Sequence, residues 1–222
     1  MDFRHEIKYE INHSDMLVIR HRLGTVAYSD PHTIDGKYHI RSLYFDDPAD
    51  KAVMDKLNGV SYREKFRIRY YNGDTSVIHL EKKTKISRLG NKQSAALTAK
   101  QAQSIVDGDT AWMIDSDNAL IRELYSRMET QCLAPKTIVD YTREPFVYPA
   151  GNVRVTLDYN IRSGIRCTDF LNPDCVTVPV SESIILEVKW DGFLPDIIRA
   201  AVSLPDRREG AFSKYAACRI YG

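Results

Sequence analysis

Basic and apolar side chains alternate along the stretch YREKFRIRYY at residues 62–71, where Arg63, Lys65, Arg67 and Arg69 take every second position. If the stretch is a β-strand, these four cations share one face of it, because successive side chains point to opposite faces. Guanidinium groups make paired hydrogen bonds to phosphate oxygens, and ammonium groups add compact point charges. A row of this kind is suited to binding a dense polyanion such as a chain of phosphates.

The same alternation occurs in other stretches, among them EIKYE at residues 6–10, HLEKK at 79–83 and LEVKW at 186–190. If the charged faces of these strands meet, the shared surface has the basic residues Lys8, Arg67, Arg69, Lys83, Arg143, Arg154 and Lys189. The acids on the same faces are fewer, namely Glu6, Glu81, Asp158 and Glu187. Like charges in an enclosed channel repel strongly, so the excess of cations indicates an anionic occupant.

The acids allow two interpretations. Carboxylate oxygens are hard ligands, so Glu187, with Glu81 and Glu6 as further candidates, could hold Mg²⁺ or Mn²⁺ between the protein and a phosphate. Alternatively, the acids balance the charge of neighbouring lysines and arginines, and Asp158 forms an ion pair with Arg154. The six histidines form no close pair at helical or strand spacing and are expected to be structural or exposed.

The elements that must position these residues are predominantly strands. Period-two alternation and β-branched or aromatic residues predict strands over 5–11, 38–47, 62–71, 76–83, 136–146, 152–161 and 183–190. Apolar stripes and capping residues predict helices over 14–24, 47–59, 98–109, 117–131 and 195–204, the second of them capped by Asp46 and Asp47. Seven or eight strands that are not regularly followed by helices predict an α+β fold with one antiparallel, closed or nearly closed sheet and helices outside it.

Two arrangements fit this pattern. In one, the apolar faces of the strands pack together in a sandwich core and the charged faces are in water. In the other, the apolar faces are covered by the helices, and the charged faces line an enclosed lumen. The helices have apolar stripes of their own, such as Met16, Leu17, Ile19 and Leu23, which need an apolar sheet face to cover. This need favours the lumen.

Composition narrows the class of protein. The chain has 222 residues, which we interpret as a single domain over 1–222, and its formal net charge of +1 argues against a nucleic-acid binder. No apolar run reaches the ~18 residues of a membrane span, and the charged start MDFRHEIKYE does not resemble a signal peptide. The four cysteines have no C-x-x-C spacing, so we expect reduced thiols, no zinc site and a cytoplasmic location.

Seven motifs in order, EIKY, KFRIRYY, LEKK, YTREPF, VRVTLDYN, ILEVKW and FSKY, resemble the catalytic domain of the vacuolar transporter chaperone (VTC) family. This domain is a branch of the triphosphate tunnel metalloenzymes, the CYTH-like superfamily. The matches run from residue 4 to about 215. The resemblance implies an eight-stranded antiparallel β-barrel that transfers the γ-phosphate of ATP to a growing polyphosphate chain in a metal-dependent reaction.

Residue roles follow from the resemblance by position. Arg67, Arg69, Lys83 and Arg143 would grip the reacting phosphates, and Glu187 would bind the metal. The implied substrate-binding residues are Lys8, Lys92, Tyr141, Arg154, Lys189, Ser213 and Lys214. Two positions depart from the family pattern: Lys8 takes the middle place of the superfamily motif E-x-E-x-K, which resembles the polymerase branch, and Ser94 stands where relatives tend to have an arginine.

Three functions stay open on these grounds. The first is a polyphosphate polymerase with ATP and inorganic polyphosphate as its partners, Mn²⁺ or Mg²⁺ as its cofactor and no nucleic-acid ligand. The second is a metal-dependent tripolyphosphatase or nucleoside triphosphatase in the same tunnel, and the third is a non-enzymatic module that binds polyphosphate or nucleotides. The sequence does not identify the acceptor, the oligomeric state or a membrane partner.

Overall fold

A computed structural model describes residues 4–87 and 89–220 and contains one antiparallel sheet. Its strands are β1 (His5–Ile11), β2 (Tyr28–Ser29), β3 (Tyr38–Asp46), β4 (Tyr62–Tyr71), β5 (Asp74–Ile86), β6 (Leu89–Leu97), β7 (Ala134–Tyr148), β8 (Val153–Ser163), β9 (Val178–Ser181) and β10 (Ile184–Trp190). Eight of them follow one path, in the order β1-β10-β8-β7-β3-β4-β5-β6, while β2 pairs with β7 and β9 with β8.

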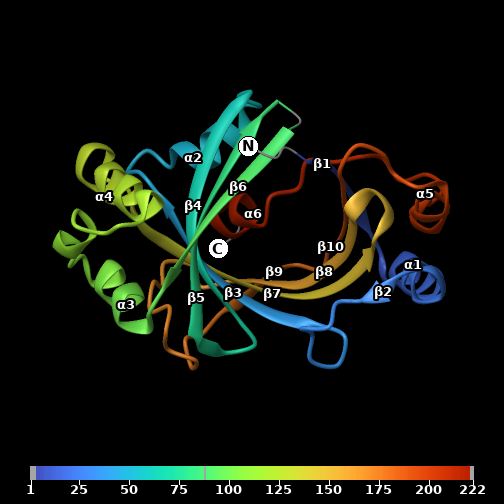
Figure 1. Ribbon diagram of the computed structural model, residues 1–222, viewed down its shortest axis with the longest axis horizontal. Helices are drawn as coiled ribbons and strands as arrows, with labels where there is room; N and C mark the ends of the chain where they lie inside the picture. The colour runs from blue at the N-terminus through green and yellow to red at the C-terminus, as the bar shows by residue number, and fades with distance from the viewer. Residues whose placement is uncertain (1–3, 88, 221–222) are drawn as a thin grey trace.

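The sheet curls until its two edge strands approach each other (Figure 1). An isolated antiparallel bridge between Arg4 and Gly90 links the β1 edge to the β6 edge. Curling of this kind leaves a concave inner face and a convex outer face, as in a barrel. The predicted α+β fold with an eight-stranded antiparallel barrel is therefore confirmed.

The helices are α1 (His13–Val26), α2 (Lys51–Leu57), α3 (Ala99–Asp107), α4 (Ala119–Gln131), α5 (Asp196–Val202) and α6 (Lys214–Ile220). Helices α3 and α4 cover the outer face of β4 to β6, where Phe66, Ile68 and Leu80 are buried against Ile105 and Leu124. Phe66 and Ile68 alternate with the cations of the inner face, and Leu80 precedes Glu81 of the same face. Because successive side chains of a strand point to opposite faces, burial of the apolar side chains against the helices directs the charged side chains into the barrel.

Helices α1 and α5 cover the opposite side of the barrel in the same way (Figure 1). Ile19 and Leu23 of α1 pack with Val155, Leu186 and Val188 from the outer faces of β8 and β10. Met16, Ile19 and Leu23 of the predicted stripe thus cover the sheet face as expected, whereas the prediction for Leu17 is wrong, because this residue is 59% exposed. The arrangement with a charged lumen is confirmed, and the sandwich arrangement is wrong.

Helix α6 is an exception to the prediction that helices lie outside. Tyr215 and Ala216 are buried with Tyr44, Tyr141 and Ile185, which belong to the inner face of the sheet. Figure 1 shows α6 within the curve of the strands. The helix fills part of the lumen with apolar side chains and so limits the space that remains for a ligand.

The predicted helix over 47–59 begins later, at Lys51, and its N-cap residue is Asp50, but the two predicted capping residues do contact its N-terminus. Asp47 Oδ1 accepts hydrogen bonds from the amides of Ala49 and Lys51, each at 3.0 Å. Asp46 Oδ1 accepts from the amide of Ala52 at 2.8 Å. Both carboxylates therefore satisfy amides at the N-terminus of α2, where unpaired donors attract negative charge.

Candidate functional site

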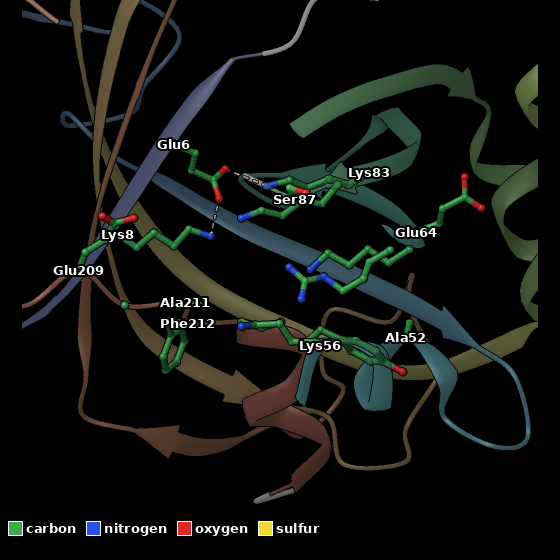
Figure 2. A pocket seen from close by; sticks show the side chains of 16 residues that line it. Glu6, Lys8, Ala52, Lys56, Glu64, Lys83, Ser87, Glu209, Ala211 and Phe212 are labelled. Atoms are coloured by element: carbon green, nitrogen blue, oxygen red, sulfur yellow. Dashed lines mark hydrogen bonds and ion pairs between the residues drawn. The ribbon is translucent and has the colours of Figure 1, made fainter. Parts of the chain in front are cut away.

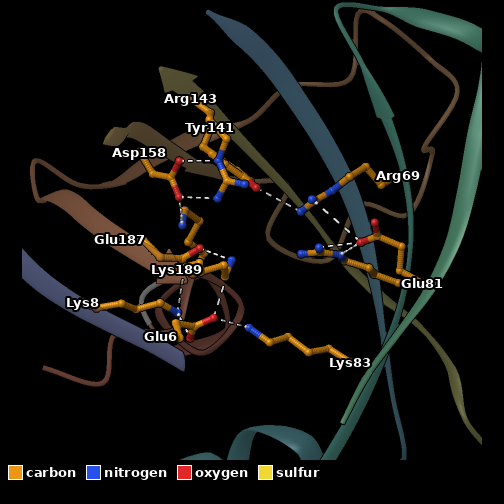
Figure 3. Close-up of polar contacts among 12 residues, drawn as sticks. Glu6, Lys8, Arg69, Glu81, Lys83, Tyr141, Arg143, Asp158, Glu187 and Lys189 are labelled. Atoms are coloured by element: carbon orange, nitrogen blue, oxygen red, sulfur yellow. Dashed lines mark hydrogen bonds and ion pairs between the residues drawn. The ribbon is translucent and has the colours of Figure 1, made fainter. Parts of the chain in front are cut away.

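The charged residues of several strands converge in the lumen, as Figure 3 shows. Strand β4 contributes Arg67 and Arg69, β5 contributes Glu81 and Lys83, and the inner faces of β1, β7, β8 and β10 complete the ring. Arg69, Glu81, Asp158 and Glu187 are all at least 95% buried. Charged side chains are rarely buried to this extent unless each one is paired with a group of opposite charge.

Arg67 and Arg69 form the first group, around Glu81. Arg67 Nε donates to Glu81 Oε2 at 2.7 Å, and Arg69 Nη1 lies 3.9 Å from the same oxygen. Arg69 also donates from Nε to Ser42 Oγ at 2.9 Å and from Nη2 to the Tyr141 hydroxyl at 3.0 Å. Fixed in this way, both guanidinium planes are oriented before a ligand arrives, which reduces the entropy lost on binding.

Aromatic rings support these cations. Arg67 Nη1 donates to the Tyr44 hydroxyl at 2.8 Å, and Lys65 Nζ lies 5.4 Å from the centroid of the Tyr44 ring. Burial would raise the pKa of Tyr44, but the charges of Arg67, Lys65 and Arg69 outweigh it and lower the pKa to about 7. A phenol that loses its proton this readily reports a strongly positive environment.

The second group surrounds the carboxylates of Glu6 and Glu187. Lys8 Nζ lies 3.1 Å from Glu6 Oε1 and 3.1 Å from Glu187 Oε2, so one ammonium bridges the two acids. Lys83 Nζ donates to Glu6 Oε2 at 2.9 Å, and Lys189 Nζ pairs with Glu187 Oε1. Figure 3 shows all five side chains meeting.

Both acids in this group stay ionised. Burial and the neighbouring Glu187 carboxylate would raise the pKa of Glu6, but the surrounding ammonium groups hold it below its usual value. Burial would likewise raise the pKa of Glu187, and Lys189 and Lys8 hold it well below its usual value. For Lys83 the nearby acids do not compensate: burial and the positive charges of Lys8 and Lys189 lower its pKa to about 7.

The third group lies at the end of the lumen next to α6. Arg143 forms a bidentate pair with Asp158, with both N–O distances at 2.7 Å. Lys214, the first residue of α6, places Nζ 2.5 Å from Asp158 Oδ2 and 4.7 Å from the centroid of the Tyr141 ring. The predicted pair between Asp158 and Arg154 is wrong, because Arg154 Nη2 bonds to Asp30 Oδ2 instead, at 3.2 Å.

The remaining predicted residues lie nearer the solvent. Lys92 Nζ is 3.1 Å from Glu81 Oε1, with its side chain 58% exposed. Ser94, the position that departs from the family pattern, is registered opposite Glu81 on the neighbouring strand, so only a hydroxyl is available there. Ser213 lines a cavity at the mouth of the lumen.

That cavity has a volume of about 450 Å³ (Figure 2). Its cationic residues outnumber its acidic ones six to three, and they are Lys8, Lys56, Arg63, Lys65, Lys83 and Lys85, against Glu6, Glu64 and Glu209. Burial lowers the pKa of Lys65 to about 8, despite the nearby Tyr44 hydroxyl. The lining also includes the aromatic rings of Phe212 and Tyr215, so charged and aromatic side chains share the cavity.

Several of these residues were not among the predicted site residues. Lys65 and Arg63 belong to the alternating stretch at 62–71 and could have been included by parity alone. Parity does not identify Lys56 or Tyr44 as site residues. Lys56 belongs to helix α2, and Tyr44 is an aromatic residue of β3 without a charge of its own. Their place in the lumen depends on strand pairing, in which Tyr44 lies opposite Arg67.

The predicted metal ligands do not all lie together. Among residues 4–87 and 89–220, no group of three or more His, Cys, Asp or Glu side chains could hold a metal ion. Glu81 is engaged with Arg67 and Lys92, so a site that combines it with Glu6 and Glu187 is not supported. Glu6 and Glu187 remain as a pair, bridged by Lys8.

A buried polar atom on the strand next to Glu187 makes no hydrogen bond among the described residues. Thr156 is 2% exposed and lies opposite Glu187 in the register of β8 and β10. That atom is the oxygen of its hydroxyl. Two carboxylates and an unpaired hydroxyl are oxygen donors of the kind that Mg²⁺ and Mn²⁺ accept. This donor set fits a divalent cation, provided that the Lys8 ammonium moves away.

Comparison with solved structures places the same fold in two other proteins. The putative adenylyl cyclase HpAC1 from Hippeastrum aligns with a TM-score of 0.56 and 12% identity, covering 97% of this chain and 94% of that one. A putative adenylate cyclase from Bacillus halodurans aligns with a TM-score of 0.52 and 11% identity, covering 90% and 86%. At these identities the likeness concerns the fold alone.

No curated protein matches the chain. No helix within the described residues has the length and apolar character to cross a membrane. The family model described as VTC domain matches residues 3–220, which include all the strands and helices described above. Because the match extends over nearly the entire chain and the barrel has the predicted charged lumen, the chain belongs to the VTC domain family.

Proposed function

We propose that the lumen binds the triphosphate of ATP together with the end of a polyphosphate chain, and that the protein transfers the γ-phosphate to that chain. The observation that carries this proposal is the convergence of Arg69, Lys83 and Arg143 in one cation-rich lumen, with Arg67 next to Arg69 at Glu81. Phosphoryl transfer requires in-line positioning and neutralisation of charge more than covalent chemistry by the protein. Side chains already held by Glu81, Asp158 and tyrosine hydroxyls can provide both.

The ion pairs of the lumen suggest how an anion is accepted. Each buried acid is shared by two or more cations, so every carboxylate leaves positive charge in excess around it. A phosphate chain can take over part of these contacts without leaving any carboxylate unpaired. Binding therefore replaces one set of charge-assisted hydrogen bonds with another and avoids the cost of exposing a buried charge.

A divalent cation, when bound, would neutralise charge on the phosphate oxygens and polarise the transferred group. The residues that would hold it are Glu187 and Glu6, with the Thr156 hydroxyl beside them. Lys8 and Lys189 would then be released from the carboxylates and could bind phosphate oxygens instead. The role of Glu81 would be to orient Arg67 and Lys92.

The protonation states favour transfer to a phosphate over transfer to water. A phosphate chain end is already anionic and needs no general base, whereas water needs one. The pKa values of Glu6, Glu81 and Glu187 are all held below the usual range, by cations that overcome the effect of burial. Carboxylates of such low basicity are poor proton acceptors, so hydrolysis would need a base other than these three acids, whereas transfer to a phosphate chain end needs none.

Incubation with ATP, Mn²⁺ and a short polyphosphate primer tests this function. We expect long-chain polyphosphate on a polyacrylamide gel and stoichiometric ADP, both absent in Arg67→Ala. Release of inorganic phosphate alone would favour a triphosphatase, the activity attributed to the Hippeastrum protein of the same fold. Tight tripolyphosphate binding without any turnover would favour a non-enzymatic binding module.

We also propose that the domain is located in the cytoplasm. ATP is present there, and the reducing conditions keep cysteines as free thiols, as they are in this chain. A membrane partner that receives the polymer is compatible with this location.

A further inference from the structure

The loop over residues 164–177 joins β8 to β9 and packs on the outer face of the barrel. Phe170 is fully buried in the core beneath α3 and α4. Its ring lies 4.9 Å from that of Tyr70, and the Tyr70 hydroxyl donates to the Phe170 carbonyl at 3.2 Å. The loop is therefore attached to β4 from outside.

A second attachment lies on the neighbouring strands. Arg41 donates from Nη1 to the Asn172 carbonyl at 2.6 Å. The same guanidinium pairs with both carboxylate oxygens of Asp140, at 3.0 and 2.9 Å. The loop thus holds β3 and, through Arg41, β7 in addition to β4.

These attachment points are next in sequence to the residues that fix Arg69. Tyr70 follows Arg69, Arg41 precedes Ser42, and Asp140 precedes Tyr141. Because neighbouring strand residues point to opposite faces, the loop contacts the reverse side of the positions that orient Arg69 in the lumen. A change in the rigidity of the loop would reach Arg69 through these three strands.

Two cysteines lie at the ends of the central part of this loop. The sulfur atoms of Cys167 and Cys175 are 2.8 Å apart, and both residues are half-buried with free thiols. A disulfide bond is about 2.05 Å long, so the two sulfur atoms lie about 0.8 Å farther apart than they would in a disulfide. The residues between them include Phe170 and Asn172, the two attachment points of the loop.

We propose that Cys167 and Cys175 are a site of reversible disulfide formation that closes this loop around Phe170 and Asn172. With a low-molecular-weight disulfide as oxidant, the Cys167 thiolate attacks one of its sulfurs and expels a thiolate, which takes up a proton. Cys175 then gives up its proton and attacks the Cys167 sulfur of the mixed disulfide, expelling the second thiolate, which takes up that proton. Two protein thiols become one disulfide, and the oxidant is reduced to two thiols.

The order of attack follows from the surroundings. Burial, with the hydrogen bond to Cys167, raises the pKa of Cys175 to about 12, so Cys175 is a thiol at neutral pH. A thiol is a far weaker nucleophile than a thiolate. Cys175 therefore acts second, after Cys167 has been joined to the oxidant at close range.

The experiment uses the full chain with Cys132→Ser, which removes the exposed cysteine and prevents disulfides between molecules. The protein is equilibrated with mixtures of reduced and oxidised glutathione, alkylated and digested with trypsin. Cys167 and Cys175 lie in one expected fragment, 167–189, which begins after Arg166 and ends at Lys189. We expect this fragment to lose about 2 Da and both alkylation sites on oxidation.

Thermal unfolding gives an independent readout. Closure of this short loop is expected to raise Tm by about 5–10 °C, and reduction should reverse the rise. The variants Cys132→Ser/Cys167→Ser and Cys132→Ser/Cys175→Ser should show no such difference between oxidised and reduced glutathione. Glutathione attached separately to each cysteine, or a fragment that stays fully alkylated, would overturn the proposal.

Binding of tripolyphosphate tests the connection to Arg69, and this arm alone depends on the proposed function. We expect the oxidised protein to bind tripolyphosphate more tightly than the reduced protein, and the two serine variants to show no dependence on oxidation. Equal affinities would overturn the connection to Arg69 but leave the disulfide standing. Absence of any tripolyphosphate binding would contradict the proposed function and not the disulfide.

Discussion

The ring of Tyr44 is stacked on the ring of Tyr215, with centroids 4.7 Å apart and planes inclined by 15°. Tyr44 belongs to the sheet and receives a hydrogen bond from Arg67, whereas Tyr215 belongs to α6 and donates to Asp46 Oδ2 at 2.9 Å. The stack therefore joins the helix inside the lumen to one of the arginines that are proposed to bind phosphate. The position of that arginine depends on the docking of α6.

Replacing Tyr215 should reveal this dependence. Tyr215→Ala removes a buried aromatic ring and is expected to lower the free energy of unfolding by about 3–5 kcal/mol. Tyr215→Phe keeps the stack and removes only the hydrogen bond to Asp46, so the loss should be about 1–3 kcal/mol. Urea unfolding followed by tyrosine fluorescence or circular dichroism measures both. Equal losses for the two variants would show that the stack contributes nothing.

Arg67 and Arg69 should carry a large share of the affinity for phosphate chains. Replacing either with alanine is expected to weaken tripolyphosphate binding by roughly 1.5–3 kcal/mol, the value of hydrogen bonds to charged groups. Isothermal titration calorimetry measures the change. Arg20→Ala is a matched control. Arg20 belongs to helix α1, outside the lumen, and forms a bidentate pair with Glu144 of β7. A similar loss in Arg20→Ala would mean that the effect is one of stability or net charge.

Removal of Arg67 should also affect stability, because it leaves Glu81 with fewer partners. We expect Arg67→Ala to lower the free energy of unfolding by about 1–3 kcal/mol, the cost of a buried charged group that loses a hydrogen bond. The double variant Arg67→Ala/Glu81→Gln removes the uncompensated charge and should recover part of that loss. A double variant less stable than either single variant would contradict this account of Glu81.

The lysines of the lumen predict opposite pH dependences for stability and for binding. The pKa values of Lys65 and Lys83 are lowered to about 8 and 7, so between pH 7 and 10 the unfolded chain binds more protons than the folded one. Stability of the empty protein should therefore rise with pH in this range. Affinity for tripolyphosphate should fall over the same range, because the anion favours protonated lysines.

Proton uptake on binding gives a direct check. Calorimetric titrations with tripolyphosphate at pH 8, in buffers of different ionisation enthalpy, should show net uptake of protons by the complex. Lys65→Met and Lys83→Met should each reduce the uptake, whereas Lys85→Met at the mouth of the cavity should reduce it less, since Lys85 is less enclosed. Release of protons on binding would contradict the assignment of both lysines.

The bridge formed by Lys8 predicts that a metal ion alone binds poorly. Lys8 occupies the position between Glu6 and Glu187, and a divalent cation must displace its ammonium. Free Mn²⁺, measured by its electron paramagnetic resonance signal, should be bound more tightly by Lys8→Met than by the wild type. Lys56→Met, which changes a lysine of the same cavity, should leave Mn²⁺ binding unchanged. Tight binding of Mn²⁺ by the wild type without phosphate would contradict the prediction.

The strands and the inward direction of the charges could be predicted from the sequence because both are local. Alternation in 62–71 fixes which side chains share a face, and the apolar stripe of 14–24 indicates which face is covered. Strand β6 was not predicted, since LGNKQSAAL is polar and rich in small residues, and it is held by pairing with β5. The pairing of strands that are far apart in the chain cannot be predicted from the local pattern of polar and apolar residues.

The same limit applies to the candidate site. Parity placed Lys83 and Glu187 correctly on the inner face, but it could not assign ion-pair partners. Asp158 and Arg154 share a face of one strand, yet Asp158 bonds to Arg143 of β7 and to Lys214 of α6. Those partners are set by the register between strands and by the unexpected position of α6 inside the barrel. Likewise, the seven residues between Cys167 and Cys175 gave no motif, and only the fold of the loop brings the sulfurs together.

The barrel closes between β1 and β6, where the bridge between Arg4 and Gly90 lies; we call this line of closure the seam. Each other pair of neighbouring strands along the eight-strand path shares at least five paired residues, whereas within the described residues β1 and β6 are connected through this isolated bridge. Within residues 4–87 and 89–220, the seam has this one bridge between β1 and β6, so deuterium should exchange faster along the β6 edge than at the centre of β7. If the barrel widens for a ligand, we expect the wall to part first at this seam, because fewer backbone pairs hold it than hold the other strands together.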